Sequence, residues 1–231
     1  MEREERLHRL AVAAADLVAP GMLVGLGTGT TANAVIRELG ARVARGLDFT
    51  GVATSRRTAA LAAELDIPLI SLDEAGLLDL GIDGADEIDP SLDAIKGRGG
   101  ALLHEKLVAL ACAEYVLVAA TEKDVRQLGE RTPLPVEIVP FGWPQTADRL
   151  AACGLHPSLR PAPGDASAPW TTDNGGYLLD CATGPMADPA SIAATVKATP
   201  GVVEHGLFLG IARMALQVDP DGNLIRRQRP E

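Results

Sequence analysis

The chain has 231 residues, 47% of them hydrophobic and only 3% aromatic, and its 21 Lys and Arg against 31 Asp and Glu give a formal net charge of −10. Nucleic-acid binders need cationic side chains that displace counterions, and single-strand binders also need aromatic stacking surfaces, so this composition argues against a nucleic-acid partner. The length and the apolar content suit one large domain or two small ones with a full core.

Several features predict a cytoplasmic protein without a membrane partner. The longest apolar runs, such as residues 107–113, fall well short of the roughly 20 residues that span a bilayer. The N-terminal residues alternate acidic and basic side chains, unlike a secretory signal. The cysteines are odd in number and widely spaced, which predicts three reduced thiols rather than disulfides or a metal knuckle: Cys112, Cys153 and Cys181.

The first half of the chain alternates helical and strand-like patterns. Helical spacing of apolar residues predicts helices over residues 3–19, after residue 31, over 55–65 with Thr54 or Ser55 as its cap, and over 101–114. Apolar runs predict strands at residues 22–26, 49–54, 67–72, 78–82 and 115–120. This alternation predicts a Rossmann-like α/β fold, a mostly parallel sheet with helices on both faces, which binds ligands at the carboxyl ends of its strands.

Prolines crowd the chain beyond residue 129. The expected elements are a strand at 135–139, a helix at 144–152, a flexible loop at 161–169, a hairpin turn at 173–176, a helix at 189–199 capped by Asp188, a strand at 202–209 and a turn at 219–223. We therefore expect a small α+β domain, residues 130–202, inserted near the C-terminal end of a catalytic domain made of residues 1–129 and 203–231. The inserted domain is expected to take part in oligomerisation.

The first unusual loop, residues 25–31, has the sequence GLGTGTT between a strand and a helix. Free backbone N–H groups and the positive helix end attract an anion there, and the hydroxyls of Thr28, Thr30 and Thr31 add donors for a phosphate or a polyol. No Gly-Lys-Ser/Thr of a Walker A loop follows, and Thr30 stands where a dinucleotide fingerprint has its third glycine. A plain capped turn explains the same residues equally well.

The second loop places Asp83 and Asp86 three residues apart, with Gly84 and Ala85 between them. Two carboxylates held close together can share a proton, so that one acts as an acid while the other stays ionised. A solvated acidic turn and a divalent-metal site are the alternatives. The ligand order and glycine position of an EF-hand are absent.

The third loop, residues 96–100 with the sequence KGRGG, opens the predicted helix 101–114. The charge of Lys96 can neutralise a developing oxyanion, and Glu105 on the first turns of the helix can serve as a general base. A lone glutamate near a helix start is also simply favourable with the helix dipole. His104 and Lys106 point to other sides of the helix, so both are expected to be surface residues.

The three loops, residues 25–31, 82–88 and 95–106, occur in an order and at a spacing that resemble the signature of type A ribose-5-phosphate isomerase. Stretches at 133–140, 172–175 and 200–208 also match that family, so the resemblance spans nearly the whole chain. It implies an isomerase that interconverts ribose 5-phosphate and ribulose 5-phosphate through an enediol, in the pentose phosphate pathway, without metal or cofactor and usually as a dimer.

The resemblance also implies roles for individual residues. Glu105 matches the general base, and Asp83, Asp86 and Lys96 match residues that open the furanose ring and stabilise its oxygens. The implied substrate contacts are Thr28, Gly29, Thr30, Thr31, Asp83, Gly84, Ala85, Asp86, Lys96, Gly97, Arg98, Gly99 and Lys123. Two positions depart from the family pattern: Thr30 replaces a common serine, and Arg98 stands where a glycine or an uncharged residue is common. We expect Arg98 to keep an ordinary backbone conformation, with its side chain directed to solvent or to the phosphate.

Two other functions compete with the isomerase. An aminosugar-phosphate deaminase or a lactonase would also need a phosphate loop and carboxylates, but would not be expected to combine the acidic loop, the second glycine-rich loop and Glu105. A sugar-phosphate sensor without turnover would ordinarily carry a partner or DNA-binding module, and no basic helix-turn-helix segment is evident.

Overall fold

The computed structural model describes residues 1–230, which form two compact units. The first unit contains Met1–Ala85, His104–Lys123 and the described residues from Gly210 onward, and the second contains Asp86–Leu103 and Asp124–Leu209. The segment Asp86–Leu103 thus belongs to the second unit, as do residues 124–129 and 203–209, although the sequence pattern placed all three in the first. The two short strands of Asp86–Leu103 pair with each other, and one of them pairs with β13 (Leu207–Phe208) within residues 203–209, which holds these segments together.

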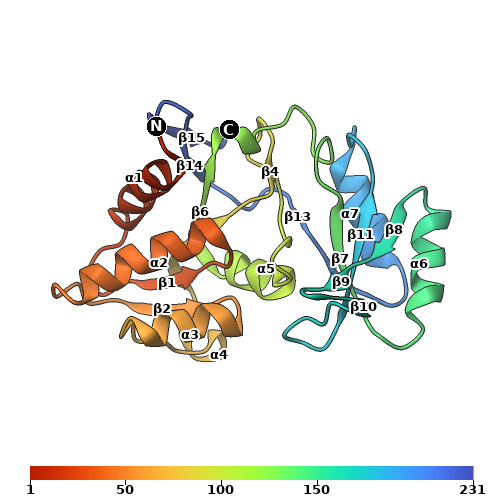
Figure 1. The fold of residues 1–231 in the computed structure, drawn as a ribbon, viewed down its shortest axis with the longest axis horizontal. Coiled ribbons are helices and arrows are strands. Elements are labelled where there is room, and N and C mark those ends of the chain that lie inside the picture. The colour runs from red at the N-terminus through yellow and green to blue at the C-terminus, as the bar shows by residue number, and fades with distance from the viewer. Residues whose placement is uncertain (231) are drawn as a thin grey trace. The chain divides into compact units, whose positions relative to one another are not determined.

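The first unit is built on a six-stranded sheet in the order β15-β14-β6-β3-β1-β2. Figure 1 labels β15, β14, β6, β1 and β2 of this sheet. All neighbouring strands are parallel except the β14–β15 hairpin, which confirms the predicted Rossmann-like sheet. The strands are β1 (Leu23–Leu26), β2 (Thr50–Ala53), β3 (Leu78–Gly84), β6 (Cys112–Ala120), β14 (Met214–Val218) and β15 (Leu224–Gln228).

Helices cover both faces of this sheet. They are α1 (Arg3–Ala15), α2 (Thr30–Val43), α3 (Arg56–Glu64), α4 (Leu72–Ala75) and α5 (Leu102–Leu110), with a 3-10 turn η1 (Thr121–Lys123). Side chains of α1, α2 and α3 share one core with Val24 and Leu26 of β1. Gly25 between them faces the other side, where a Cβ atom would lie 2.5 Å from Val108 of α5. Successive residues of β1 therefore point to opposite faces of the sheet, so that α1 to α3 pack on one face and α5 packs on the other.

The second unit is an α+β structure with three small sheets. Its four-stranded antiparallel sheet has the order β12-β7-β11-β8, beside a three-stranded sheet β13-β5-β4 and the hairpin β9–β10. The elements are β4 (Glu87–Ile88), β5 (Ala94–Ile95), β7 (Leu134–Ile138), α6 (Trp143–Ala152), β8 (His156–Leu159), β9 (Pro161–Ala162), β10 (Asp165–Pro169), β11 (Tyr177–Ala182), α7 (Pro189–Ala198), β12 (Val202–His205) and β13 (Leu207–Phe208).

Local signals are confirmed where a side chain or a turn defines them. The Ser55 hydroxyl accepts the Thr58 N–H at the start of α3, and the Asp188 carboxylate accepts the Ser191 N–H at the start of α7. The predicted turn at 173–176 joins Thr171 to Tyr177 of β11, with Gly175 at a φ of 80°.

The predicted extents of three elements were wrong, because contacts with residues distant in sequence set where these elements begin and end. The expected strand 67–72 makes only a bridge between Leu69 and Gly51, because Pro68 lacks an N–H and a capping box at Ser71 starts α4. The first helix ends at Ala15 rather than at residue 19. The helix expected to reach residue 114 ends at Leu110, because β6 begins at Cys112 as a partner of β3.

Two predictions for the second unit were also wrong. The loop 161–169, expected to be flexible, is the paired hairpin β9–β10. The strand expected at 202–209 is divided at Gly206 between two sheets, and a Cβ atom at Gly206 would overlap the carbonyl oxygen of Lys96. Within residues 1–230, no helix has the length and apolar character needed to cross a bilayer.

Candidate active site

The carboxylate of Asp83, at the end of β3 in the first unit, is buried and oriented by backbone N–H groups. Its Oδ1 accepts hydrogen bonds from the N–H of Thr28 at 3.0 Å and of Gly84 at 2.7 Å, and its Oδ2 accepts one from the Tyr115 hydroxyl at 3.4 Å. A Cβ atom on Gly27 would overlap the Asp83 carboxyl group. The glycine in the first loop is therefore required for this approach.

The Thr28 hydroxyl lies in a buried cluster of hydroxyl groups. It is 2.7 Å from the Thr54 hydroxyl, 2.8 Å from that of Ser55 and 3.0 Å from that of Thr58. The Thr58 hydroxyl in turn donates to the carbonyl oxygen of Gly27. Thr28 therefore links the first loop to the start of α3 through its hydroxyl and to Asp83 through its N–H.

The first unit also contains a cavity of about 320 Å³ beside the N-terminus of α2. Four predicted substrate-binding residues line it: Thr30, Thr31, Ala85 and Lys123. Gly29 is the N-cap of α2, has a φ of 114° and supplies no side-chain cap, so the first N–H groups of a 14-residue helix are not capped by it. A helix N-terminus with nearby hydroxyl and ammonium groups favours an anion.

Two further cations line this cavity that the sequence analysis missed, Arg3 and Arg6 of α1. Arg6 forms an ion pair with Glu122 at 2.7 Å, and its hydrogen bond lowers the pKa of the Glu122 carboxyl. The available signal was the spacing of three residues between the two arginines, which places them on one face of a helix. Because Arg6 is paired with Glu122, the positive charge that α1 adds to the cavity lining is that of Arg3.

Glu105 on α5 is buried, with 3% of its surface exposed. Tyr115 of β6 is close to both carboxylates: burial first, and then the charges of Asp83 and Glu105, raise the pKa of Tyr115 well above its usual range. The phenol therefore stays a neutral hydrogen-bond donor to Asp83. The sequence analysis did not single out Tyr115, because only the pairing of β3 with β6 brings it beside Asp83.

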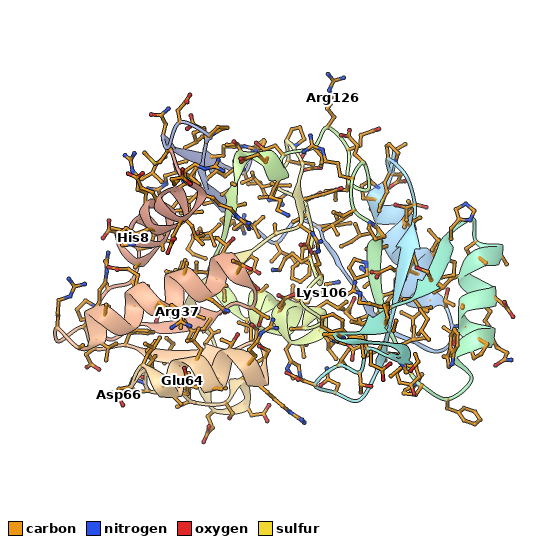
Figure 2. The ribbon with its side chains drawn as sticks, viewed as in Figure 1. His8, Arg37, Glu64, Asp66, Lys106 and Arg126 are labelled. Atoms are coloured by element: carbon orange, nitrogen blue, oxygen red, sulfur yellow. The ribbon has the colours of Figure 1, made fainter. Side chains whose placement is uncertain are left out.

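The expectation that Lys106 is a surface residue was wrong, since this side chain of α5, labelled in Figure 2, is buried. His104, also expected at the surface, is half-buried. Leu107 and Leu110 are the exposed residues of this helix instead. Apolar residues occur all round α5, so it has no polar face from which exposure could be predicted.

In the second unit, Lys96 begins the glycine-rich loop and is 2% exposed. Its Nζ atom lies 5.3 Å from the centre of the Phe208 ring, and its backbone N–H donates to the Gly206 carbonyl. Gly97 and Gly100 take positive φ values of 107° and 80°, whereas Arg98 between them does not, which confirms its predicted ordinary conformation. The charge of Lys96 is thus held in a buried setting where it acts strongly.

Asp86 is joined directly to this loop. Its Oδ2 accepts the N–H of Arg98 at 3.0 Å, and its own N–H donates to the Ile95 carbonyl. The exposed Arg98 side chain and Asp86 line a cavity of about 490 Å³ in the second unit. Within residues 1–230, no group of three or more His, Cys, Asp or Glu side chains is arranged to hold a metal ion.

Comparison with known proteins identifies the family. The model of the family described as ribose 5-phosphate isomerase A (phosphoriboisomerase A) matches residues 50–222. The chain belongs to this family. A ribose-5-phosphate isomerase A of Roseiflexus castenholzii is 53% identical over 217 residues, which cover 93% of this chain and 92% of the relative.

Solved members of the ribose 5-phosphate isomerases share the fold over their full length. The enzyme from Methanocaldococcus jannaschii has a TM-score of 0.92 and 34% identity, covering 98% of this chain and 100% of its own. A D-ribose-5-phosphate isomerase in complex with phospho-erythronic acid has a TM-score of 0.94 and 34% identity, covering 99% and 100%. These findings confirm the resemblance noted in the sequence and make the chain an isomerase by family membership.

Proposed function

We propose that the chain interconverts D-ribose 5-phosphate and D-ribulose 5-phosphate through an enediol, in the non-oxidative pentose phosphate pathway. The observation that carries the proposal is the set of buried groups at the predicted positions, a general-base candidate in Glu105, an oriented carboxylate in Asp83 and a buried cation in Lys96. An aldose-ketose isomerase needs a base, donors for oxygen atoms and an anchor for the phosphate.

Glu105 carries the proton in this proposal. Its carboxylate takes the proton from C2 of the open-chain aldose, the electrons of the C–H bond form the C1–C2 double bond, and the C1 oxygen takes up a proton. The enediol becomes the ketose when C1 receives the proton from Glu105 and the C2 hydroxyl loses its own. Burial at 3% exposure keeps water away from the carboxyl group between the two transfers.

The oxygen atoms of the substrate interact with Asp83, Asp86 and Lys96 in this proposal. The two carboxylates accept and return the proton that opens the furanose ring, and both are oriented by backbone N–H groups, Asp83 by that of Thr28 and Asp86 by that of Arg98. The ammonium group of Lys96 stabilises the negative charge that develops on the substrate oxygens. No metal ion or nucleotide takes part in these steps.

The phosphate end is assigned to the cavity of the first unit. Thr30, Thr31 and Lys123 bind the phosphate there with the N-terminus of α2, and Arg3 adds positive charge, whereas the charge of Arg6 is balanced by Glu122. The relative solved with phospho-erythronic acid, whose name denotes a phosphorylated sugar acid, supports a ligand of this class. The remaining predicted contacts, from Gly29, Gly84, Ala85, Gly97, Arg98 and Gly99, belong to the three loops.

We also propose a cytoplasmic homodimer formed through the second unit. Phe141 is 95% exposed and Val139 is also exposed, and a subunit contact would cover this apolar surface. The cysteines of the described chain are free thiols, in keeping with a reducing compartment. The net charge of −10 leaves nucleic acid an unfavourable partner.

The test is an assay of the purified chain in excess EDTA with ribose 5-phosphate, unphosphorylated ribose, glucosamine 6-phosphate and 6-phosphogluconolactone. We expect ribulose 5-phosphate from the first compound, little turnover of ribose, no release of ammonia, and no acceleration of lactone opening over the rate without protein. Binding of ribose 5-phosphate without turnover would contradict the proposal in favour of a sensor. Turnover of only the third or fourth compound would indicate a deaminase or a lactonase.

A further inference from the structure

We propose that Arg160 is a positioning residue for the glycine-rich loop 96–100. By holding two carbonyl groups of the loop, it sets the direction of the loop's N–H groups and, through one of them, the place of Asp86. This inference rests on the proposed function, which gives Asp86 and Lys96 their roles on the substrate. All the residues that carry it lie in the second unit.

Arg160, which joins β8 to β9 in the chain, is buried, with 8% of its surface exposed. Its Nε donates to Asp180 Oδ2 at 2.8 Å, and its Nη2 donates to Asp180 Oδ1. Its Nη1 donates to the carbonyl oxygens of Gly97 at 2.9 Å and of Arg98 at 3.1 Å. The planar guanidinium group therefore binds the Asp180 carboxylate through Nε and Nη2, and two successive loop carbonyls through Nη1. The ammonium group of a lysine does not reproduce this geometry.

By holding the carbonyl groups of Gly97 and Arg98, Arg160 also sets the direction of the N–H groups on the opposite side of the loop. In a trans peptide the C=O of one residue and the N–H of the next point in opposite directions within one plane, and no peptide among residues 1–230 is cis. The plane that offers Gly97 O to Arg160 therefore directs the Arg98 N–H away from Arg160, and this N–H is the group that Asp86 Oδ2 accepts at 3.0 Å. The next plane offers Arg98 O to Arg160 and directs the Gly99 N–H away from it in the same manner.

Trp170 holds the end of the same loop. Its ring lies 5.5 Å from Arg160 Cζ, and its backbone N–H donates to the Arg160 carbonyl at 2.8 Å. A Cβ atom on Gly100 would lie 2.7 Å from Trp170 Nε1, so the loop packs directly on the indole. Arg160 and Trp170 together therefore contact three of the five residues of the loop.

A loop with three glycines has many accessible conformations, and ordering it costs conformational entropy. Oriented N–H and ammonium groups accelerate a reaction only if they are in place before the charge develops. Asp180 neutralises Arg160, so the loop is held without an unpaired buried charge. Loss of Arg160 should therefore reduce kcat much more than it raises KM.

The kinetic test uses Arg160→Met and Arg160→Lys, with Lys197→Met as the matched control. Lys197 is also a cation that bonds a carboxylate, Glu204, and a carbonyl, Val203, but it lies on α7 and is exposed. We expect kcat for ribose 5-phosphate to fall about 10- to 100-fold in both Arg160 variants, with KM within about 3-fold, and neither to change in Lys197→Met. Arg160→Lys keeps a cation beside Asp180 and remains informative if Arg160→Met does not fold.

A second readout does not depend on activity. Amide hydrogen exchange of Arg98, followed by NMR, should become about 10-fold faster in both Arg160 variants and stay unchanged in Lys197→Met, because the peptide plane loses its anchor. A parent protein without isomerase activity would defeat the proposed function, while the exchange rate would still decide the positioning. Folded Arg160 variants with the parent's kcat, or with unchanged exchange of Arg98, would overturn the inference.

Discussion

The Thr28 N–H donates to Oδ1 of Asp83 over 3.0 Å and so connects the ends of two neighbouring parallel strands, β1 and β3. The contact brings the first loop onto the acidic loop with no side chain between them, because Gly27 contributes no Cβ atom at the point of closest approach. The orientation of the Asp83 carboxylate therefore depends on a glycine one residue away from its hydrogen-bond donor.

Gly27→Ala should displace the Asp83 carboxyl group, since the added Cβ atom would overlap it. We expect kcat/KM to fall about 100-fold and the free energy of unfolding to fall by about 1–3 kcal/mol, the usual cost of overpacking. Steady-state kinetics and urea unfolding measure the two effects. Gly40→Ala is the matched control, because its added Cβ atom would also be too close to a neighbour, at 2.7 Å from Leu65 Cβ. Gly40 lies near the far end of α2, away from the first loop. It should lose stability and keep the parent's kinetics, whereas parent-like kinetics in Gly27→Ala would contradict the account of Asp83.

Lys96→Met should retain the apolar stem beside Phe208 while removing the charge. An electrostatic contribution of about 2–4 kcal/mol to the transition state corresponds to a loss of roughly 30- to 1,000-fold in kcat. Thermal unfolding would show that the variant is folded, and initial rates at saturating ribose 5-phosphate would give the loss. A rate near that of the parent would mean that the buried ammonium group has only a structural role.

The three loops were identifiable from the sequence because each combines glycines with polar side chains within a few residues. Ser55 and Asp188 were equally visible as helix caps, since a cap is a local arrangement. Arg6 and Tyr115 were missed because they are distant in sequence from the loops, and only the packing of α1 and the pairing of β3 with β6 bring them to the site.

The same reason explains the elements that were misassigned. Cys112 has the local environment of a helix end, yet it pairs with Leu78 in the sheet. Lys106 has the polarity of a surface residue, yet it is buried, while Leu107 on the same helix is exposed. Long-range contacts outweigh the local preference in both cases.

The thiols of the buried Cys181 and the half-buried Cys112 predict a loss of stability at alkaline pH. Burial raises the pKa of Cys181 from an ordinary value of 9.0 to about 12, and burial raises that of Cys112 to about 12 as well. The unfolded thiol ionises first as the pH rises, so the unfolded state holds fewer protons and the free energy of unfolding falls between about pH 9 and pH 12. For Cys181 alone the loss is on the order of 1 kcal/mol at pH 10.

Urea unfolding at pH 8 and pH 10 measures this dependence. Cys181→Ala should be less stable at both pH values because it leaves a cavity, but its loss of stability between them should be smaller than the parent's by about 1 kcal/mol. A variant with the same loss as the parent would show that the Cys181 thiol does not contribute to the pH dependence.

The most direct test of the enediol mechanism follows the proton itself. Proton NMR of ribose 5-phosphate in D2O with excess EDTA should show ribulose 5-phosphate and deuterium at the carbon next to the carbonyl when the parent is present. Glu105→Gln should bind ribose 5-phosphate within a few-fold of the parent's affinity, yet lose isomerisation and exchange by at least about 100-fold. Glu64→Gln, an exposed glutamate on α3, serves as the control and should match the parent. Isomerisation and exchange in Glu105→Gln at the parent's rate would contradict the assignment of Glu105 as the base.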